Sequence, residues 1–151
     1  MALWDQLKSR TQTMSTQLKS KSDQFRSKEF AAGSMAMCAL VAAADGSIDP
    51  AEQNRTMSLI ESNEVLKNFP AADLRQKFEF YCDKLRKDFE FGKVEAIGTI
   101  AKLKSKPDQA RGVISIGIII GGADGDFDAQ ERRVVAEACN ALGVPPAEYD
   151  L

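Results

Sequence analysis

The chain has 151 residues, of which 44% are hydrophobic and 28% charged, and its formal net charge is -2. This length fits one domain that buries roughly 70% of the surface of its unfolded chain. The near balance of charges opposes a general affinity for nucleic acid. The absence of histidine removes the imidazole on which most nucleophile pairs depend. We therefore expect a folded protein that is not an enzyme and has no nucleic acid partner.

Membrane insertion, export and disulfide bonding are not indicated either. The sequence has no uncharged apolar run of 18 residues and no signal-peptide pattern, which predicts a cytoplasmic location. Its three cysteines, Cys38, Cys82 and Cys139, are widely spaced in mostly apolar surroundings. This pattern favours reduced thiols in the core over a disulfide framework or a zinc site.

Residues 1–28 form a basic amphipathic arm, with six basic and two acidic side chains against 14 and 20 in the rest of the chain. Its apolar residues recur at helical spacing, but many Ser and Thr residues weaken the helix prediction. The arm either docks on the body as a solvated helix or contacts a membrane or a partner. The residues assigned to such a contact are Trp4, Lys8, Arg10, Lys19, Lys21, Arg26 and Lys28.

The rest of the chain, residues 29–151, is predicted to be one all-α domain. Two segments, 30–44 and 113–122, are uncharged and rich in small or apolar residues, so both are expected to be buried. The β-branched run of 113–122 also suits a strand, and only the repeat described next favours a helix. Further amphipathic helices are expected at about 50–62, 70–87, 91–104 and 129–142. The expected architecture is a compact bundle of about seven or eight helices.

One acidic motif occurs twice in this bundle. Residues 44–52 read ADGSIDPAE and residues 123–131 read ADGDFDAQE, 79 positions apart. Each copy follows a buried segment and precedes an amphipathic helix. We therefore predict a duplicated helix-loop-helix unit with halves at about 29–69 and 107–146, related by a pseudo-twofold axis.

Helix capping explains much of this motif without a ligand. The glycines suit a left-handed position after a helix, the second Asp suits an N-cap, and the Glu three residues later completes a capping box. Pro50 also stands at a first helical position. Capping does not explain the Asp before each glycine. It also does not explain the apolar residue, Ile48 or Phe127, that stands between the glycine and the second Asp.

The alternative explanation is a cation site. The motif matches the last eight positions of a calcium EF-hand loop, although Val41, Ala43, Ile120 and Gly122 stand where its first two acids would be. If both loops meet at one end of the molecule, their carboxylates form one acidic cluster that a divalent cation such as Ca²⁺ or Mg²⁺ neutralises. The predicted ligands are Asp45, Asp49, Glu52, Asp124, Asp126, Asp128 and Glu131.

Several features together resemble the TerB family of tellurite resistance proteins. They are the arm that closes in Lys28-Glu29-Phe30, the buried helix that runs into Ala44-Asp45-Gly46, the later run Ala123 to Asp128, and the ending LGVPPAEY. The resemblance covers essentially the whole chain. Asp45, Asp49, Glu52, Asp124, Asp128 and Glu131 match the acidic positions of the family, whereas Ser47 stands where the second copy has Asp126.

The resemblance implies an all-helical fold and a role in the bacterial ter system, which protects against tellurite and other stresses including phage and colicins. It implies no enzymatic reaction. It implies partners among the other Ter proteins, namely a TerC-like membrane protein and TerD-like calcium-binding proteins, at the inner face of the membrane. A thiol-dependent redox protein that handles tellurite, and a protein-binding module whose acidic loops are only helix caps, remain as alternatives.

Overall fold

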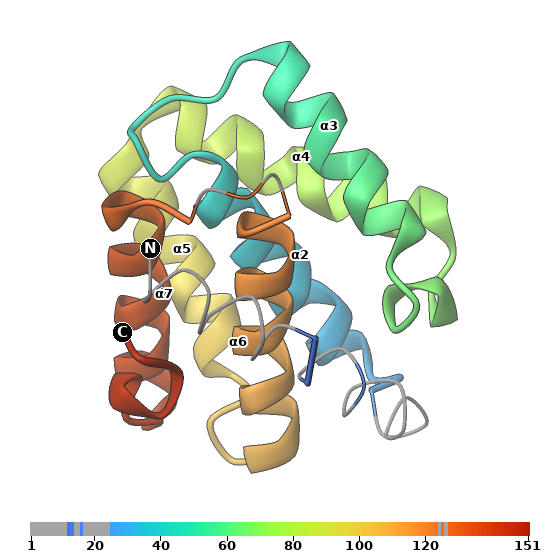
Figure 1. Ribbon diagram of the computed structural model, residues 1–151. Coiled ribbons are helices and arrows are strands. Elements are labelled where there is room, and N and C mark those ends of the chain that lie inside the picture. The colour runs from blue at the N-terminus through green and yellow to red at the C-terminus, as the bar shows by residue number, and fades with distance from the viewer. Residues whose placement is uncertain (1–11, 14–15, 17–24, 124, 126) are drawn as a thin grey trace.

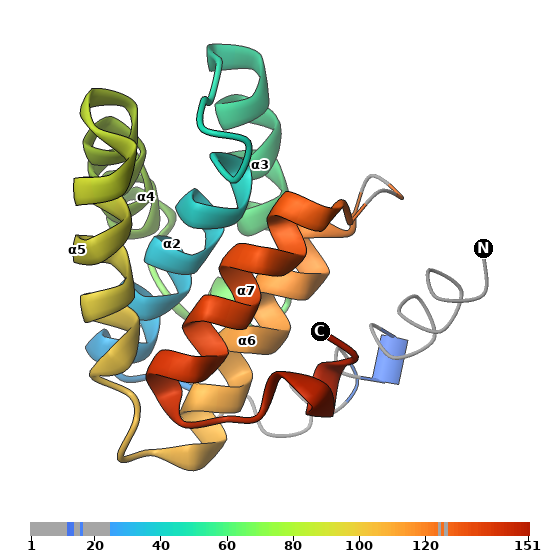
Figure 2. The ribbon, with the colours of Figure 1, turned by 90° about the vertical axis from the view of Figure 1, so that its left-hand side faces the viewer.

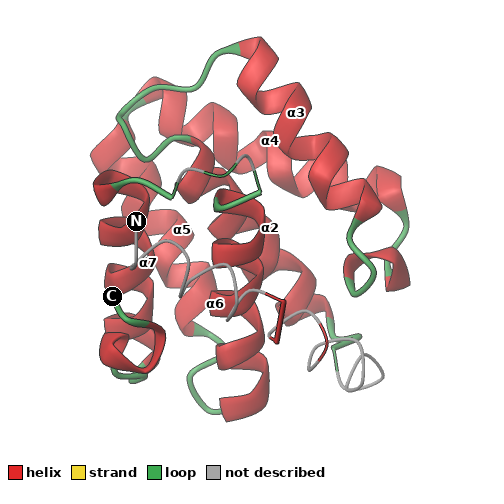
Figure 3. Ribbon diagram, viewed as in Figure 1, coloured by secondary structure: helices red, strands yellow, loops and turns green. Residues whose placement is uncertain are grey.

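The computed structural model describes residues 12, 13, 16, 25–123, 125 and 127–151. Within these ranges the chain is helical and contains no strand (Figure 3). The prediction of an all-α fold is therefore confirmed. None of the helices in these ranges is long and apolar enough to cross a membrane.

Six α-helices and two short 3₁₀ helices make up the described part of the chain (Figure 1). They are α2 (Lys28–Ala42), α3 (Pro50–Ser62), η2 (Leu66–Asn68), α4 (Ala71–Lys87), α5 (Phe89–Ala101), α6 (Pro107–Gly121), α7 (Ala129–Leu142) and η3 (Pro146–Tyr149). The expected total of seven or eight helices is not established by these residues. Residues 113–122, whose sequence also suited a strand, belong mainly to helix α6.

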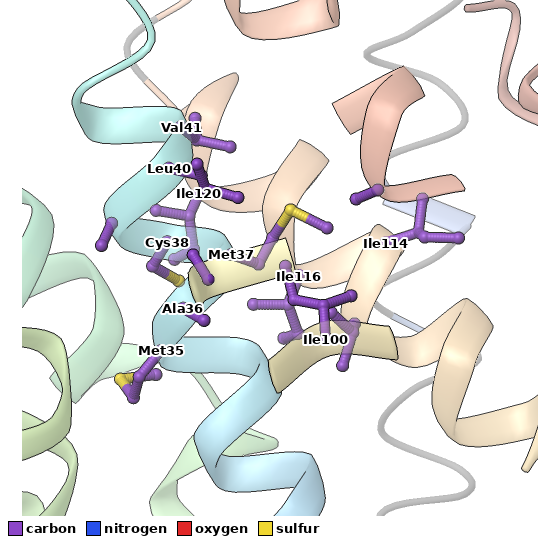
Figure 4. Packing of buried hydrophobic residues seen from close by; sticks show 14 of the residues in the cluster. Met35, Ala36, Met37, Cys38, Leu40, Val41, Ile100, Ile114, Ile116 and Ile120 are labelled. Atoms are coloured by element: carbon purple, nitrogen blue, oxygen red, sulfur yellow. The ribbon is translucent and has the colours of Figure 1, made fainter. Parts of the chain in front are cut away.

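Helix α2 is the central element of the bundle. It packs against α4 and α5 on one side and against α6 and α7 on the other, as Figure 2 shows. Residues 33–41 of α2 are all buried. Among them, Met35, Met37 and Leu40 belong to the core shown in Figure 4. This confirms the expectation, drawn from the uncharged segment 30–44, of a helix buried on most sides.

Helices α2 and α6 run parallel and side by side. A Cβ atom on Gly33 would lie 3.5 Å from Cγ2 of Val113, and one on Gly117 would lie 2.7 Å from Cγ of Met37. Both pairs are 80 positions apart in the sequence, so the two helices keep the same direction and height. Because the helices are parallel, the loops that follow them leave the bundle at the same end.

The second halves of the two helix-loop-helix units pack differently. Helix α7 lies against α2, α5 and α6, whereas α3 leans away from the bundle and buries only Met57 and Ile60 (Figures 1 and 2). Parallel α2 and α6 meet one requirement of the predicted pseudo-twofold axis. The axis itself stays a prediction.

Candidate functional site

The two acidic loops share one backbone hydrogen-bond pattern. In the first loop, Gly46 N–H donates to the carbonyl of Ala43 (2.8 Å), and in the second, Gly125 N–H donates to the carbonyl of Gly122 (3.0 Å). Both glycines have a positive φ, 95° and 89°, which residues with a side chain rarely adopt. The expected left-handed glycine is therefore confirmed in both copies.

Each loop ends in a complete capping box. Asp49 Oδ1 accepts from the backbone N–H of Glu52 (2.8 Å), and Glu52 Oε2 accepts from the N–H of Asp49 (3.3 Å). The equivalent bonds between Asp128 and Glu131 measure 2.8 and 2.9 Å. These four carboxylates thus start helices α3 and α7, as the capping explanation predicts.

The structure also explains residues that capping leaves aside. Ile48 and Phe127 are each 5% exposed and belong to the hydrophobic core, so they anchor the loops to the bundle. Asp45 closes a local turn, since its Oδ1 accepts from the N–H of Ser47 (3.1 Å) and from its hydroxyl (3.4 Å). Asp124, the counterpart of Asp45, lies outside the described residues, as does Asp126.

Carboxylates of both loops line one pocket of about 160 Å³. Asp45 and Glu52 come from the first copy, and Asp128 and Glu131 come from the second. The side chain of Asp49 faces its own cap and does not line the pocket. The condition set for an acidic cluster, that both loops lie at one end, is met by these four residues, and the parallel packing of α2 and α6 is the reason.

Helix α3 supplies a wall of the pocket that the sequence reasoning missed. Arg55, Thr56 and Leu59 line the pocket together with Glu52. Their spacing from Glu52, three, four and seven residues, is that of one helix face and was a usable signal. Arg55 places a positive charge among the carboxylates.

No three acidic or thiol side chains in the described ranges are arranged to hold a metal ion as they stand. The oxygens that accept in the capping boxes point to their own backbone amides. The seven-residue ligand set includes Asp124 and Asp126 and stays a prediction.

The N-terminal contact residues fall mostly outside the described part of the chain. Trp4, Lys8, Arg10, Lys19 and Lys21 lie there, whereas Arg26 and Lys28 are described and exposed. Phe25 next to them is buried, with its ring centroid 4.9 Å from that of Phe30. The chain is therefore fixed to the bundle from Phe25 onward.

All three cysteines are free and buried. Desolvation by burial raises the pKa of the Cys82 and Cys139 thiols to about 12, and burial raises the pKa of Cys38 further. The expectation of core thiols is confirmed. A buried thiol with a raised pKa has little of the reactive thiolate form.

The fold and the pocket define an all-helical protein with two acidic loops at one end of a pair of parallel helices. Residues 31–151 match the family described as Tellurite resistance protein TerB, and the chain belongs to that family. It is 27% identical over 118 residues to the Tellurium resistance protein TerB of Alcaligenes sp., covering 78% of this chain and 97% of the relative. A comparison with solved structures found no significant match. The resemblance seen in the sequence is thereby confirmed.

Proposed function

We propose that this TerB-family protein is a non-catalytic component of tellurite resistance that binds a divalent cation, Ca²⁺ or Mg²⁺, between its two acidic loops. The observation behind the proposal is that Asp45 and Glu52 of one loop and Asp128 and Glu131 of the other line a single pocket. Carboxylate oxygens are the ligands that these hard cations prefer.

The geometry fits a weak, adjustable site better than a rigid cage. Capping bonds engage one oxygen each of Asp49, Glu52, Asp128 and Glu131. Since Ca²⁺ takes six to eight oxygens, water and loop carbonyls would complete its shell. Arg55 in the same pocket lowers the affinity for a cation. We expect dissociation constants between about 10 μM and 1 mM, within the range of calcium modules.

The proposed scaffolding role rests on family membership and on the segregation of charge. The six basic side chains of residues 1–28 would contact the membrane surface or another Ter protein. The acidic end of the bundle would respond to the cation. TerC-like and TerD-like proteins are the proposed partners, at the inner face of the membrane.

Calorimetric titration of the chelator-stripped protein with Ca²⁺, Mg²⁺ and Mn²⁺ tests the cation site. The decisive variant is Asp45→Asn/Glu52→Gln/Glu131→Gln. It removes three pocket charges but keeps an oxygen acceptor at each turn and cap position, because Gln also serves in a capping box. We expect saturable binding in the unmodified protein and at least a tenfold loss of affinity in the variant.

A matched control is Glu64→Gln/Asp73→Asn/Glu79→Gln, which removes three exposed charges away from the pocket. It is expected to bind cations as the unmodified protein does. Equal losses in both triple variants would indicate a general effect of net charge. Absence of binding below about 1 mM would contradict the cation proposal.

A protein-binding module without a cation is the second candidate function. It is favoured by the complete capping boxes and by the turn at Asp45, which account for every described carboxylate of the two loops. In that case the acidic end would bind a basic surface of another Ter protein directly. The same titration separates the two candidates, because only the first requires a cation.

The burial of Cys38, Cys82 and Cys139 opposes the thiol-dependent redox alternative. Counting the native thiols that react with DTNB tests it. We expect all three to react slowly in the native protein and rapidly in urea, since unfolding exposes them. A fast-reacting native thiol would revive the redox alternative.

A further inference from the structure

The large hydrophobic side chains that the described residues leave exposed belong to one pair of helices. They are Phe80 on α4 (50% exposed) and Phe91 and Val94 on α5 (58% and 68% exposed). Helices α4 and α5 lie on the side of α2 opposite α6, and α5 also contacts α7 (Figure 2). An exposed apolar cluster of this kind commonly marks an interaction site.

These side chains lie on one face, which we call the α4–α5 face. Lys84 connects the two helices on this side, because its Nζ lies 5.4 Å from the ring centroid of Phe80 and 3.7 Å from a carboxylate oxygen of Glu95. Phe91 and Glu95 are four residues apart on α5 and share that side of the helix. Phe80 of α4 and Phe91 of α5 therefore lie on the same side of this helix pair.

Gly98 gives a second, independent indication that the α4–α5 face contacts a partner. It stands inside α5, where glycine destabilises a helix relative to alanine. Elsewhere the fold requires its helical glycines: a Cβ on Gly92 would lie 2.8 Å from the backbone of Leu85. A Cβ on Gly98 would meet nothing within 4 Å. Gly98 lies seven residues after Phe91 and thus on the same face, where its small size lets another helix approach closely.

The charges around the face indicate what kind of partner it fits. On and beside this face the printed ion pairs join opposite charges, Lys84 with Glu95 and Lys93 with Glu90, so neither sign predominates. This balance opposes an anionic membrane or a strongly charged protein. A twofold interface brings the same surface of two copies together, so each basic group can meet an acidic group of the other copy.

We propose that the α4–α5 face is the interface of a homodimer, with Phe80, Phe91 and Val94 at its centre and the two α5 helices crossing at Gly98. Two neighbouring helices of these lengths offer a face of roughly 400 Å². Standard interfaces bury about 800 Å² per partner. The dimer is therefore a weak one, with a dissociation constant in the micromolar range.

Sedimentation equilibrium of the full chain from about 5 to 500 μM tests the proposal over this range. The apparent mass is expected to rise from 16.5 kDa toward twice that value. Val94→Glu places a charge at the centre of the face without disturbing the monomer, since Val94 is largely exposed. It is expected to weaken dimerisation at least tenfold. The control Asn54→Glu adds the same charge at an exposed position of α3 and leaves the dimer unchanged.

Gly98→Leu is a second variant that separates association from folding. Its side chain enters open space in the monomer, so the helix is retained and the thermal midpoint does not fall. In the dimer it holds the two α5 helices apart and weakens association at least tenfold.

A mass of 16.5 kDa at every concentration overturns the proposal. A dimer that neither variant weakens also overturns it, because such a dimer would use another surface such as the arm. Binding of the monomer to phosphatidylglycerol vesicles, lost in Val94→Glu, would instead assign the face to lipid.

Discussion

Val41 on α2 and Gly121 on α6 lie so close that a Cβ atom on Gly121 would fall 2.6 Å from Cγ1 of Val41. Both residues line the pocket between the acidic loops, so the approach of the two helices determines how near the loops come to each other. The same Cβ would also lie 3.0 Å from the ring of Phe127, the apolar anchor of the second loop.

Substitution Gly121→Ala is therefore expected to destabilise the protein by about 1–3 kcal/mol, the usual cost of overpacking a core. Urea denaturation measures the change. Gly98→Ala is the matched control, because the same methyl group there meets open space and removes a helical glycine. It is expected to stabilise the monomer by about 1 kcal/mol. Unchanged stability of Gly121→Ala would show that α2 and α6 separate without cost.

The equal distances from the two N-cap acceptors to their amides predict equal energetic effects. Asp49→Ala and Asp128→Ala each remove an N-cap acceptor 2.8 Å from its amide and are expected to cost about 1 kcal/mol. Denaturation in the presence of a chelator measures these losses without a contribution from a bound cation. Serine at either position keeps an acceptor and is expected to restore most of the stability. If Asp→Ala has no effect, capping is not the reason for these residues.

The buried thiols predict a loss of stability in alkali. The pKa values of Cys82 and Cys139 are about 12 in the folded chain, above the ordinary value of 9.0 that applies after unfolding. Their stabilising contribution is complete below pH 9 and declines as the pH rises toward 12, because the folded state then binds more protons than the unfolded state. Each thiol contributes a slope of up to about 1.4 kcal/mol per pH unit.

Urea denaturation at pH 8, 9 and 10 measures this slope. Cys139→Ala lowers the overall stability but is expected to reduce the slope between pH 9 and 10, because one titrating group is absent. A slope that is the same in both proteins would mean that Cys139 does not titrate in this range on unfolding.

Helix boundaries were predictable where a cap stands next to the helix it starts. The predicted ranges 50–62 and 129–142 coincide with α3 and α7, which Asp49 and Asp128 cap. The buried segments 30–44 and 113–122 mark only the apolar parts of α2 and α6, which begin at Lys28 and Pro107. Ser27 caps α2, and Pro107 stands in the first turn of α6, so both starts carry a local signal in the sequence.

The prediction for the candidate site was partly successful. The motif correctly indicated a left-handed glycine and a capping box in each loop. It did not indicate that Arg55 shares the pocket with the carboxylates, since that depends on where α3 lies relative to the two loops. The burial of Ile48 and Phe127 likewise follows from packing and not from the motif.

The sequence by itself determined the family, the helical fold and the local structure of the two loops. The helices and the loops are local, because the hydrogen bonds that define them join residues at most four positions apart. Only the tertiary structure decided that the two loops share one pocket and that α4 and α5 leave an apolar face exposed. Contacts such as Val41 with Gly121 join residues 80 positions apart. They depend on the packing of the whole core and have no signature in any short stretch of sequence.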